Sequence, residues 1–142
     1  MLAVAKRLSK RPSNGIIGLN LGANKTSANR IGDFANVFKT CCEFVDFATV
    51  NVSSPNTKDL RELQKKDNLA VLLRELSQQR RELNRKLIMI KIDPDSSNEH
   101  YSMMINLVQK YKIDGIIATN TSVSRPDILK DANRTKEGGL SG

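Results

Sequence analysis

Four short apolar segments of the chain each end on a side chain that can take part in chemistry: an amide, a hydroxyl or an ammonium group. These side chains are Asn20, Asn51, Lys91 and the pair Thr119 and Asn120, spaced about 30 to 40 residues apart. Amides and hydroxyls can both donate and accept hydrogen bonds. An ammonium group inside the run IMIKIDPD (88–95) is costly to bury without an anionic partner. If the segment ends meet, they form a site for one polar ligand.

The second segment runs into the sequence VNVSSPNT (50–57). An ordinary turn needs only one or two residues of the Gly, Pro, Asn, Asp and Ser group. This stretch carries two serines, two asparagines and a threonine around Pro55, whose ring fixes the backbone angle φ. The density of hydroxyl and amide groups on a rigid bend indicates that a ligand uses some of them.

The elements that must position these residues follow from hydrophobic periodicity. Near-continuous apolar runs rich in β-branched residues predict strands at 15–22, 43–52, 86–92 and 114–120, covered on both faces. Apolar residues at spacings of three and four predict helices at 29–44, 68–83 and 97–111, the last with Ser96 and Glu99 at capping-box spacing. The alternation of strand and helix predicts a parallel sheet with right-handed crossovers.

We interpret this order as a partial (β/α)8 TIM barrel of about four consecutive βα units. In such barrels the carboxyl ends of the strands converge on one mouth, which is where the chemistry is done. A full barrel takes about 250 residues, so the 142 residues supply half of one. A four-unit half-barrel is one alternative. The ending KEGGLSG (136–142) and two exposed sheet edges favour a piece of a longer protein. A doubly wound fold is the structural alternative, although GLNLGANKTS (18–27) lacks the G-x-G-x-x-G pattern.

Composition indicates a globular protein, with 39% apolar and 27% charged residues. The net charge of +8 comes mainly from basic residues interleaved with Glu on predicted helices, so we expect solvated helix faces and no nucleic-acid partner.

Residues 1–14 are interpreted as a basic linker or the tail of a preceding helix. The adjacent Cys41 and Cys42 have neither disulfide nor metal-ligand spacing, and no metal site is predicted. His100 is expected on a helix surface.

Several motifs together resemble the dihydroorotate dehydrogenases of the membrane-associated, quinone-reducing class. They are NLGANKTS (20–27), NVSSPNT (51–57) followed by LRELQ (60–64), IKIDPD (90–95), and ATNTSVSRP (118–126) with GGLSG (138–142). NVSSPNT is highly specific and the others are strong in combination. The resemblance runs over residues 15–142, which it implies are the central portion of a single FMN-binding (β/α)8 barrel domain.

The resemblance implies an FMN enzyme that oxidises dihydroorotate to orotate in pyrimidine synthesis, with a quinone as electron acceptor. It assigns flavin contact to Asn20, Asn51, Lys91, Thr119 and Gly142. It assigns substrate contact to Asn51, Asn56, Asn120 and Thr121, and it makes Ser54 the catalytic base. The soluble relatives carry Cys at the position of Ser54, so a serine there points to the quinone-linked class.

Ser54 needs a second group to take up its proton, because a serine hydroxyl is far less basic than a histidine and no Ser–His pair is evident. A water or hydroxyl relay through Thr57, Thr119 or Thr121 is our hypothesis. Lys91 suits the N1–C2=O edge of the flavin, where negative charge collects on reduction. The chain departs from the family pattern at Ala23 and at Asp93, and we expect Asp93 to draw the Lys91 ammonium away from the flavin.

The resemblance also sets expectations about the rest of the protein. Membrane association is expected through segments outside this chain, at the mitochondrial inner membrane of a eukaryote or at the cytoplasmic membrane of a bacterium. The first barrel strands and the later phosphate-binding loops also lie outside it, so we expect a fragment that alone lacks part of the flavin site. The alternatives are another flavin barrel acting on a pyrimidine-like ring, and an inactive truncated product that binds a partner through its basic helices.

Overall fold

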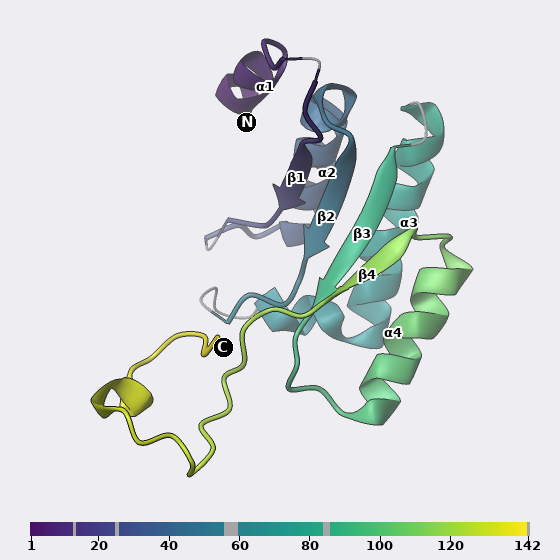
Figure 1. Ribbon diagram of the computed structural model, residues 1–142. Coiled ribbons are helices and arrows are strands. Elements are labelled where there is room, and N and C mark those ends of the chain that lie inside the picture. Colours follow the sequence, from purple (N-terminus) through teal and green to yellow (C-terminus); the bar gives the residue numbers. More distant parts are fainter. Residues whose placement is uncertain (13, 25, 56–59, 84–85, 142) are drawn as a thin grey trace.

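The computed structural model contains one sheet of four parallel strands in the order β1-β2-β3-β4 (Figure 1). It describes residues 1–12, 14–24, 26–55, 60–83 and 86–141. The strands are β1 (Gly18–Leu21), β2 (Phe47–Asn51), β3 (Leu87–Ile92) and β4 (Gly115–Ala118). The four predicted strands and their parallel pairing are therefore confirmed, although each strand is shorter than its apolar run.

The three helices that connect these strands form one layer. They are α2 (Arg30–Cys41), α3 (Lys66–Glu82) and α4 (Asn98–Lys110), and α3 packs between α2 and α4 (Figure 1). A strictly sequential strand order with right-handed crossovers puts every connecting helix on the same face of the sheet. A doubly wound sheet reverses its strand order and carries helices on both faces. The barrel-like interpretation is confirmed and the doubly wound alternative is wrong.

Shorter elements complete the chain. They are α1 (Leu2–Leu8) and the 3-10 helices η1 (Cys42–Phe44), η2 (Leu60–Gln64) and η3 (Ala132–Thr135). The predicted basic tail thus begins with a helix. Within the described residues, no helix is both long and apolar enough to cross a membrane.

The core lies between the sheet and the helix layer. Alternate strand residues point toward the helices and are fully buried: Ala48 and Val50 of β2 and Ile88 and Ile90 of β3. They pack with buried helix residues, namely Phe34, Phe38, Leu69, Leu72, Leu73, Leu76 and Met104. The apolar residues whose spacing of three and four predicted the helices are therefore the residues that the helices bury.

The opposite face of the sheet, called the inner face here, carries no helix of the described chain. Strand register aligns Gly18 with Phe47 and Leu87 on this face, and Asn51 with Lys91 and Ile117. A Cβ on Gly18 would lie 2.2 Å from the Phe47 ring, so only glycine allows the ring to cross β1. Leu87 remains 49% exposed. The expectation of strands covered on both faces is therefore confirmed for the helix side and holds only in part for the inner face, where Thr49 is buried and Leu87 is not.

Two Asp–Arg pairs brace the amino-terminal edge of the sheet. Asp46 accepts hydrogen bonds from Arg11 at 2.6 and 3.0 Å and from the Ile17 backbone N–H at 2.7 Å. Asp114 accepts from Arg80 Nη1 at 2.5 Å and from the Ile88 backbone N–H at 2.8 Å. In each pair the aspartate stands just before a strand and ties it to the preceding strand.

Local details differ from the sequence predictions in two places. The amino-terminal cap of α4 is Ser97 and not Ser96: the Ser97 Oγ accepts from the His100 backbone N–H at 3.2 Å. Ser96 instead donates to Asp93. Cys41 and Cys42 are free, and both are fully buried. Burial raises the pKa of both thiols, which keeps them protonated at neutral pH.

Candidate functional site

The carboxyl-terminal edge of the sheet brings three of the strand-end polar residues onto the inner face. Asn51 of β2 and Lys91 of β3 are direct neighbours in the parallel ladder. Asn20 of β1 pairs with Thr49, two residues before Asn51, so it lies on the same face but one level lower. The sequence prediction that successive strand ends share a rim therefore agrees with the register.

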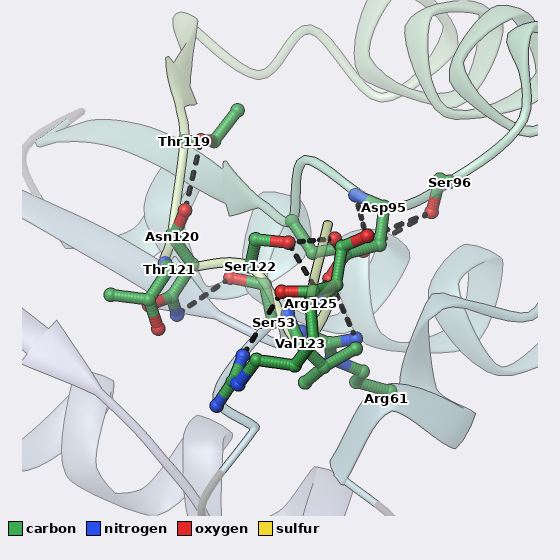
Figure 2. Close-up of polar contacts among 12 residues, drawn as sticks. Ser53, Arg61, Asp95, Ser96, Thr119, Asn120, Thr121, Ser122, Val123 and Arg125 are labelled. Atoms are coloured by element: carbon green, nitrogen blue, oxygen red, sulfur yellow. Dashed lines mark hydrogen bonds and ion pairs between the residues drawn. The ribbon is translucent and has the colours of Figure 1, made fainter. Parts of the chain in front are cut away.

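A partly buried hydrogen-bond network joins the loops that follow β2 and β4 (Figure 2). The Asn120 side-chain N–H₂ donates to Ser53 Oγ at 3.0 Å and to Asn51 Oδ1 at 3.3 Å. The Ser53 hydroxyl also donates to Asn51 Oδ1 at 3.3 Å. Asn120 Oδ1 accepts from the Thr121 backbone N–H at 2.9 Å. Four bonds thus fix the rotation of two amides that the sequence assigned to substrate or flavin.

Ser53 is the residue of this network that sequence reasoning missed. It is fully buried, whereas the neighbouring Ser54, which was assigned as the base, is half-buried. Both serines belong to NVSSPNT, and two adjacent serines on a loop carry no periodicity that would decide which hydroxyl points into the protein. The assignments made for Asn56 and Gly142, and the relay through Thr57, lie outside the described residues.

Lys91 lines an open cleft of about 360 Å³. The other lining residues are Pro94, Thr119, Asn120, Thr121, Ser122, Leu140 and Ser141. Lys91 is half-buried and Thr119 is exposed, with its hydroxyl donating to the Asn120 carbonyl at 2.9 Å. The cleft therefore combines one ammonium group with hydroxyl and amide groups, which suits a polar or anionic ring.

Asp93 does not neutralise Lys91. Its carboxylate accepts from the Asp95 backbone N–H at 2.9 Å and from Ser96 Oγ at 3.1 and 3.2 Å, and its carbonyl accepts from the Tyr101 hydroxyl at 3.1 Å. Among the described residues, no ion pair joins it to Lys91. The expectation that Asp93 draws the ammonium away is wrong, because Asp93 organises the turn from β3 into α4. The other departure, Ala23, packs half-buried against the core.

The glycine-rich segment 138–141 closes one side of the cleft. Ser122 and Leu140 form an antiparallel bridge with backbone hydrogen bonds of 3.0 and 2.8 Å. A Cβ on Gly139 would lie 1.7 Å from Thr121 Oγ1, and Gly138 has φ at 117°, a conformation that favours glycine. The two glycines therefore allow the segment to approach Thr121 closely.

Comparisons with known proteins agree with this geometry. A family model described as Dihydroorotate dehydrogenase matches residues 1–142. The relative named dihydroorotate dehydrogenase (quinone) from Cereibacter sphaeroides is 43% identical over 141 residues, covering 98% of this chain and 40% of the relative. The mitochondrial dihydroorotate dehydrogenase (quinone) of Schizosaccharomyces pombe is 42% identical over 132 residues, covering 91% of this chain and 30% of that protein.

A solved structure of ligand-free DHODH from Eimeria tenella is 30% identical and superimposes with a TM-score of 0.91 over 99% of this chain and 46% of its own. A second structure from the same organism, in complex with ferulenol, has a TM-score of 0.87. The chain thus spans about two fifths of the length of the relatives it matches, and its four strands and three connecting helices are part of their barrel. On the full-length family match and these identities, the chain belongs to the dihydroorotate dehydrogenase family.

Proposed function

We propose that the protein containing this chain is an FMN-dependent dihydroorotate dehydrogenase that passes electrons to a quinone. The observation that carries the proposal is the network joining Asn51, Ser53 and Asn120 beside Lys91, at the edge of the sheet where barrel enzymes do their chemistry. The quinone-linked names of the relatives support the choice of electron acceptor. In domain terms, residues 15–142 are the central portion of one barrel domain, and 1–14 form a basic lead-in.

The substrate would be held by amide groups. Dihydroorotate carries C=O and N–H groups in alternation, and each Asn amide offers one acceptor oxygen and two donor hydrogens in the same plane. The Asn120 amide is held in one orientation by three hydrogen bonds to other groups of the protein. Preorganised groups avoid the entropic cost of ordering on binding. We assign Asn51, Asn120 and Thr121 to the substrate on this ground, and Asn56 on the resemblance alone.

The described residues also fit an FMN ring by their chemistry. When bound, FMN accepts the hydride that leaves dihydroorotate. Lys91 would supply a fixed positive charge beside the ring, and Asn20, Asn51 and the Thr119 hydroxyl would supply hydrogen bonds at neighbouring strand ends. Gly142, by resemblance, would lie near the flavin phosphate.

Ser54 is proposed as the group that takes the proton. It follows Ser53 and precedes Pro55 on the loop after β2, so it stands next to the network that orients the amides. The only histidine of the sequence, His100, lies in the first turn of α4 and belongs to a different element from the loop. A hydroxyl relay through Thr119 or Thr121 remains our hypothesis for the onward path of the proton.

Quinone binding and membrane association are proposed for segments outside this chain. The S. pombe relative is named as mitochondrial, and other quinone-linked relatives are bacterial. The protein would accordingly work at the mitochondrial inner membrane of a eukaryote or at the cytoplasmic membrane of a bacterium.

The proposal is tested by expressing the complete reading frame and measuring dihydroorotate-dependent quinone reduction together with the bound flavin. Asn51→Ala should lower the activity strongly. Asn36→Ala, an exposed asparagine on the helix layer, serves as the matched control and should leave it unchanged. A protein that binds flavin but transfers no electrons from dihydroorotate would overturn the proposal.

A further inference from the structure

One carboxylate, that of Asp95, contacts groups from the two βα loops on either side of its own at the rim of the sheet (Figure 2). Asp95 itself stands in the loop between β3 and α4. It accepts from Arg61 Nη1 at 3.3 Å, in the 3-10 helix η2 that follows the NVSSPNT loop. It also accepts from the Ser122 hydroxyl and, at 2.9 Å, from the Val123 backbone N–H, both in the loop after β4.

We propose that Asp95 is a positioning residue for the dehydrogenase reaction, holding the loop that carries Asn120 and Thr121 in register with the loop that carries Ser54. The inference rests on the proposed function for its catalytic consequence, but the connection between the loops stands on the contacts alone. Ser122 follows Thr121 directly, and Arg61 comes seven positions after Ser54. A single side chain thus contacts the residue next to Thr121 and a residue of the 3-10 helix that follows the NVSSPNT loop.

The contacts of Asp95 with Arg61, Ser122 and Val123 are called the clamp here. The electrostatics favour an ionised Asp95 at its centre. Burial alone raises the pKa of Asp95, but the hydrogen bonds from Ser122, Val123 and Arg61 together lower it below its ordinary value, so the group is an anion at neutral pH. Its side chain is only 18% exposed and that of Arg61 29%, which weakens screening by salt. Hydrogen bonds to an ionised acceptor are roughly twice as strong as neutral ones.

The guanidinium group of Arg61 has few other partners. Its Nε and Nη2 atoms are buried and meet no hydrogen-bond acceptor within the described ranges. Asp95 is therefore the anion that compensates this half-buried cation. Removing the carboxylate would free the loop after β4 and would also leave Arg61 unbalanced beside the NVSSPNT loop.

The clamp reaches further than its direct contacts. The Ser122 Oγ also accepts from the Ser124 backbone N–H at 2.8 Å, and the Ser122 backbone pairs with Leu140. Arg125 donates to the Gly138 carbonyl at 2.7 Å. The loop after β4 and the glycine-rich segment are consequently tied together, and we expect them to shift as one unit when Asp95 is lost.

The test compares Asp95→Ala with Asp127→Asn in the complete protein. Asp127 is an exposed carboxylate four positions after Val123, and the control removes the same unit of charge. We expect Asp95→Ala to speed amide exchange at Val123 and Leu140 by tenfold or more. With flavin still bound, we expect it to raise KM for dihydroorotate by about 10- to 100-fold and to change kcat less. Ser122→Ala removes one of the hydrogen bonds that Asp95 accepts. It should change the exchange rates and KM in the same direction by smaller factors.

Faster exchange with an unchanged KM would refute the positioning role and leave the proposed function intact. Exchange and kinetics equal to those of Asp127→Asn would refute the clamp itself. If the wild-type protein does not oxidise dihydroorotate, the proposed function fails and with it the catalytic role, while the exchange data still decide whether the loops are clamped. Should Asp95→Ala not fold, Asp95→Asn keeps the shape of the side chain and Ser122→Ala spares the ion pair, and the same criteria apply to both.

Discussion

Replacing Ser53 by alanine removes the central hydroxyl of the network between Asn51 and Asn120. That hydroxyl accepts from Asn120 at 3.0 Å and donates to Asn51 at 3.3 Å, and the residue is fully buried. A buried donor left without its acceptor costs about 1–3 kcal/mol. Because Asn120 is only half-buried and keeps its 3.3 Å bond to Asn51, we expect a loss of about 1–2 kcal/mol in the free energy of unfolding.

The same change should weaken substrate binding, because the Asn120 amide loses its 3.0 Å bond to Ser53 and is then held only by its 3.3 Å bond to Asn51 and by the Thr121 N–H. Restoring the orientation of the amide on binding costs at most the stabilisation that is lost, about 1–2 kcal/mol, which is a factor of about 5–30 in an equilibrium constant. KM for dihydroorotate should therefore rise by up to about that factor with little change in kcat. Ser54→Ala is the matched variant. It should lower the rate of flavin reduction about 10²- to 10⁴-fold with flavin still bound, which is the usual contribution of a positioned base.

Rapid-mixing measurements of flavin bleaching against dihydroorotate concentration separate the two effects. The saturating rate reports the proton-transfer step, and the concentration at half-saturation reports binding. If Ser53→Ala lost the saturating rate while Ser54→Ala kept it, the roles of the two serines would be exchanged. If neither variant changed either quantity, the network would have no part in the reaction.

Three further predictions follow from the ion pairs and from Lys91. Lys91→Ala should reduce bound flavin or lower its reduction potential, whereas Lys39→Ala, on α2, should do neither; equal flavin content and potential in both would remove Lys91 from the site. Asp114→Ala should lower the free energy of unfolding by about 1–3 kcal/mol, because Arg80, 13% exposed, loses its carboxylate, and urea unfolding measures the loss. Asp46→Asn should matter less at low pH. The Arg11 guanidinium and the Ile17 N–H hold the pKa of Asp46 well below its ordinary value, so its contribution is present above pH ~4 and fades as pH falls below that. A stability difference from wild type that is constant between pH 7 and pH 3 would contradict this sign.

The order of strands and helices could be predicted because periodicity is a local property. The buried leucines of α3 recur every three or four residues, and that spacing is visible without any knowledge of the fold. Element ends were less certain, because they depend on distant partners. Ile17 looks like strand sequence, yet its N–H and C=O groups bind the side chain and backbone of Asp46, and β1 begins only at Gly18.

The candidate site was predictable only in part, for the same reason. Asn51 and Lys91 could be placed on one rim from the spacing of strand ends, since parallel strands in sequential order align their carboxyl ends. Ser53 and Asp95 could not be found, because their partners lie far away in sequence: Asn120 for Ser53, and Arg61 and Ser122 for Asp95. Only the folded chain shows that the second aspartate of IKIDPD joins three loops.

The two edges of the sheet have different roles: the polar groups of one stabilise the fold, and those of the other are available to a ligand. At the amino-terminal edge, the carboxylates of Asp46 and Asp114 accept hydrogen bonds from arginines and from backbone N–H groups at or just before the preceding strand. At the carboxyl-terminal edge, Asn51 and Asn120 are held by neutral hydrogen bonds, and the ammonium of Lys91 faces the cleft without a carboxylate partner among the described residues. An ion pair at Lys91 would neutralise the charge that an anionic ligand requires. Changes at the first edge should therefore alter unfolding and spare KM, whereas changes at the second should alter KM and flavin binding first.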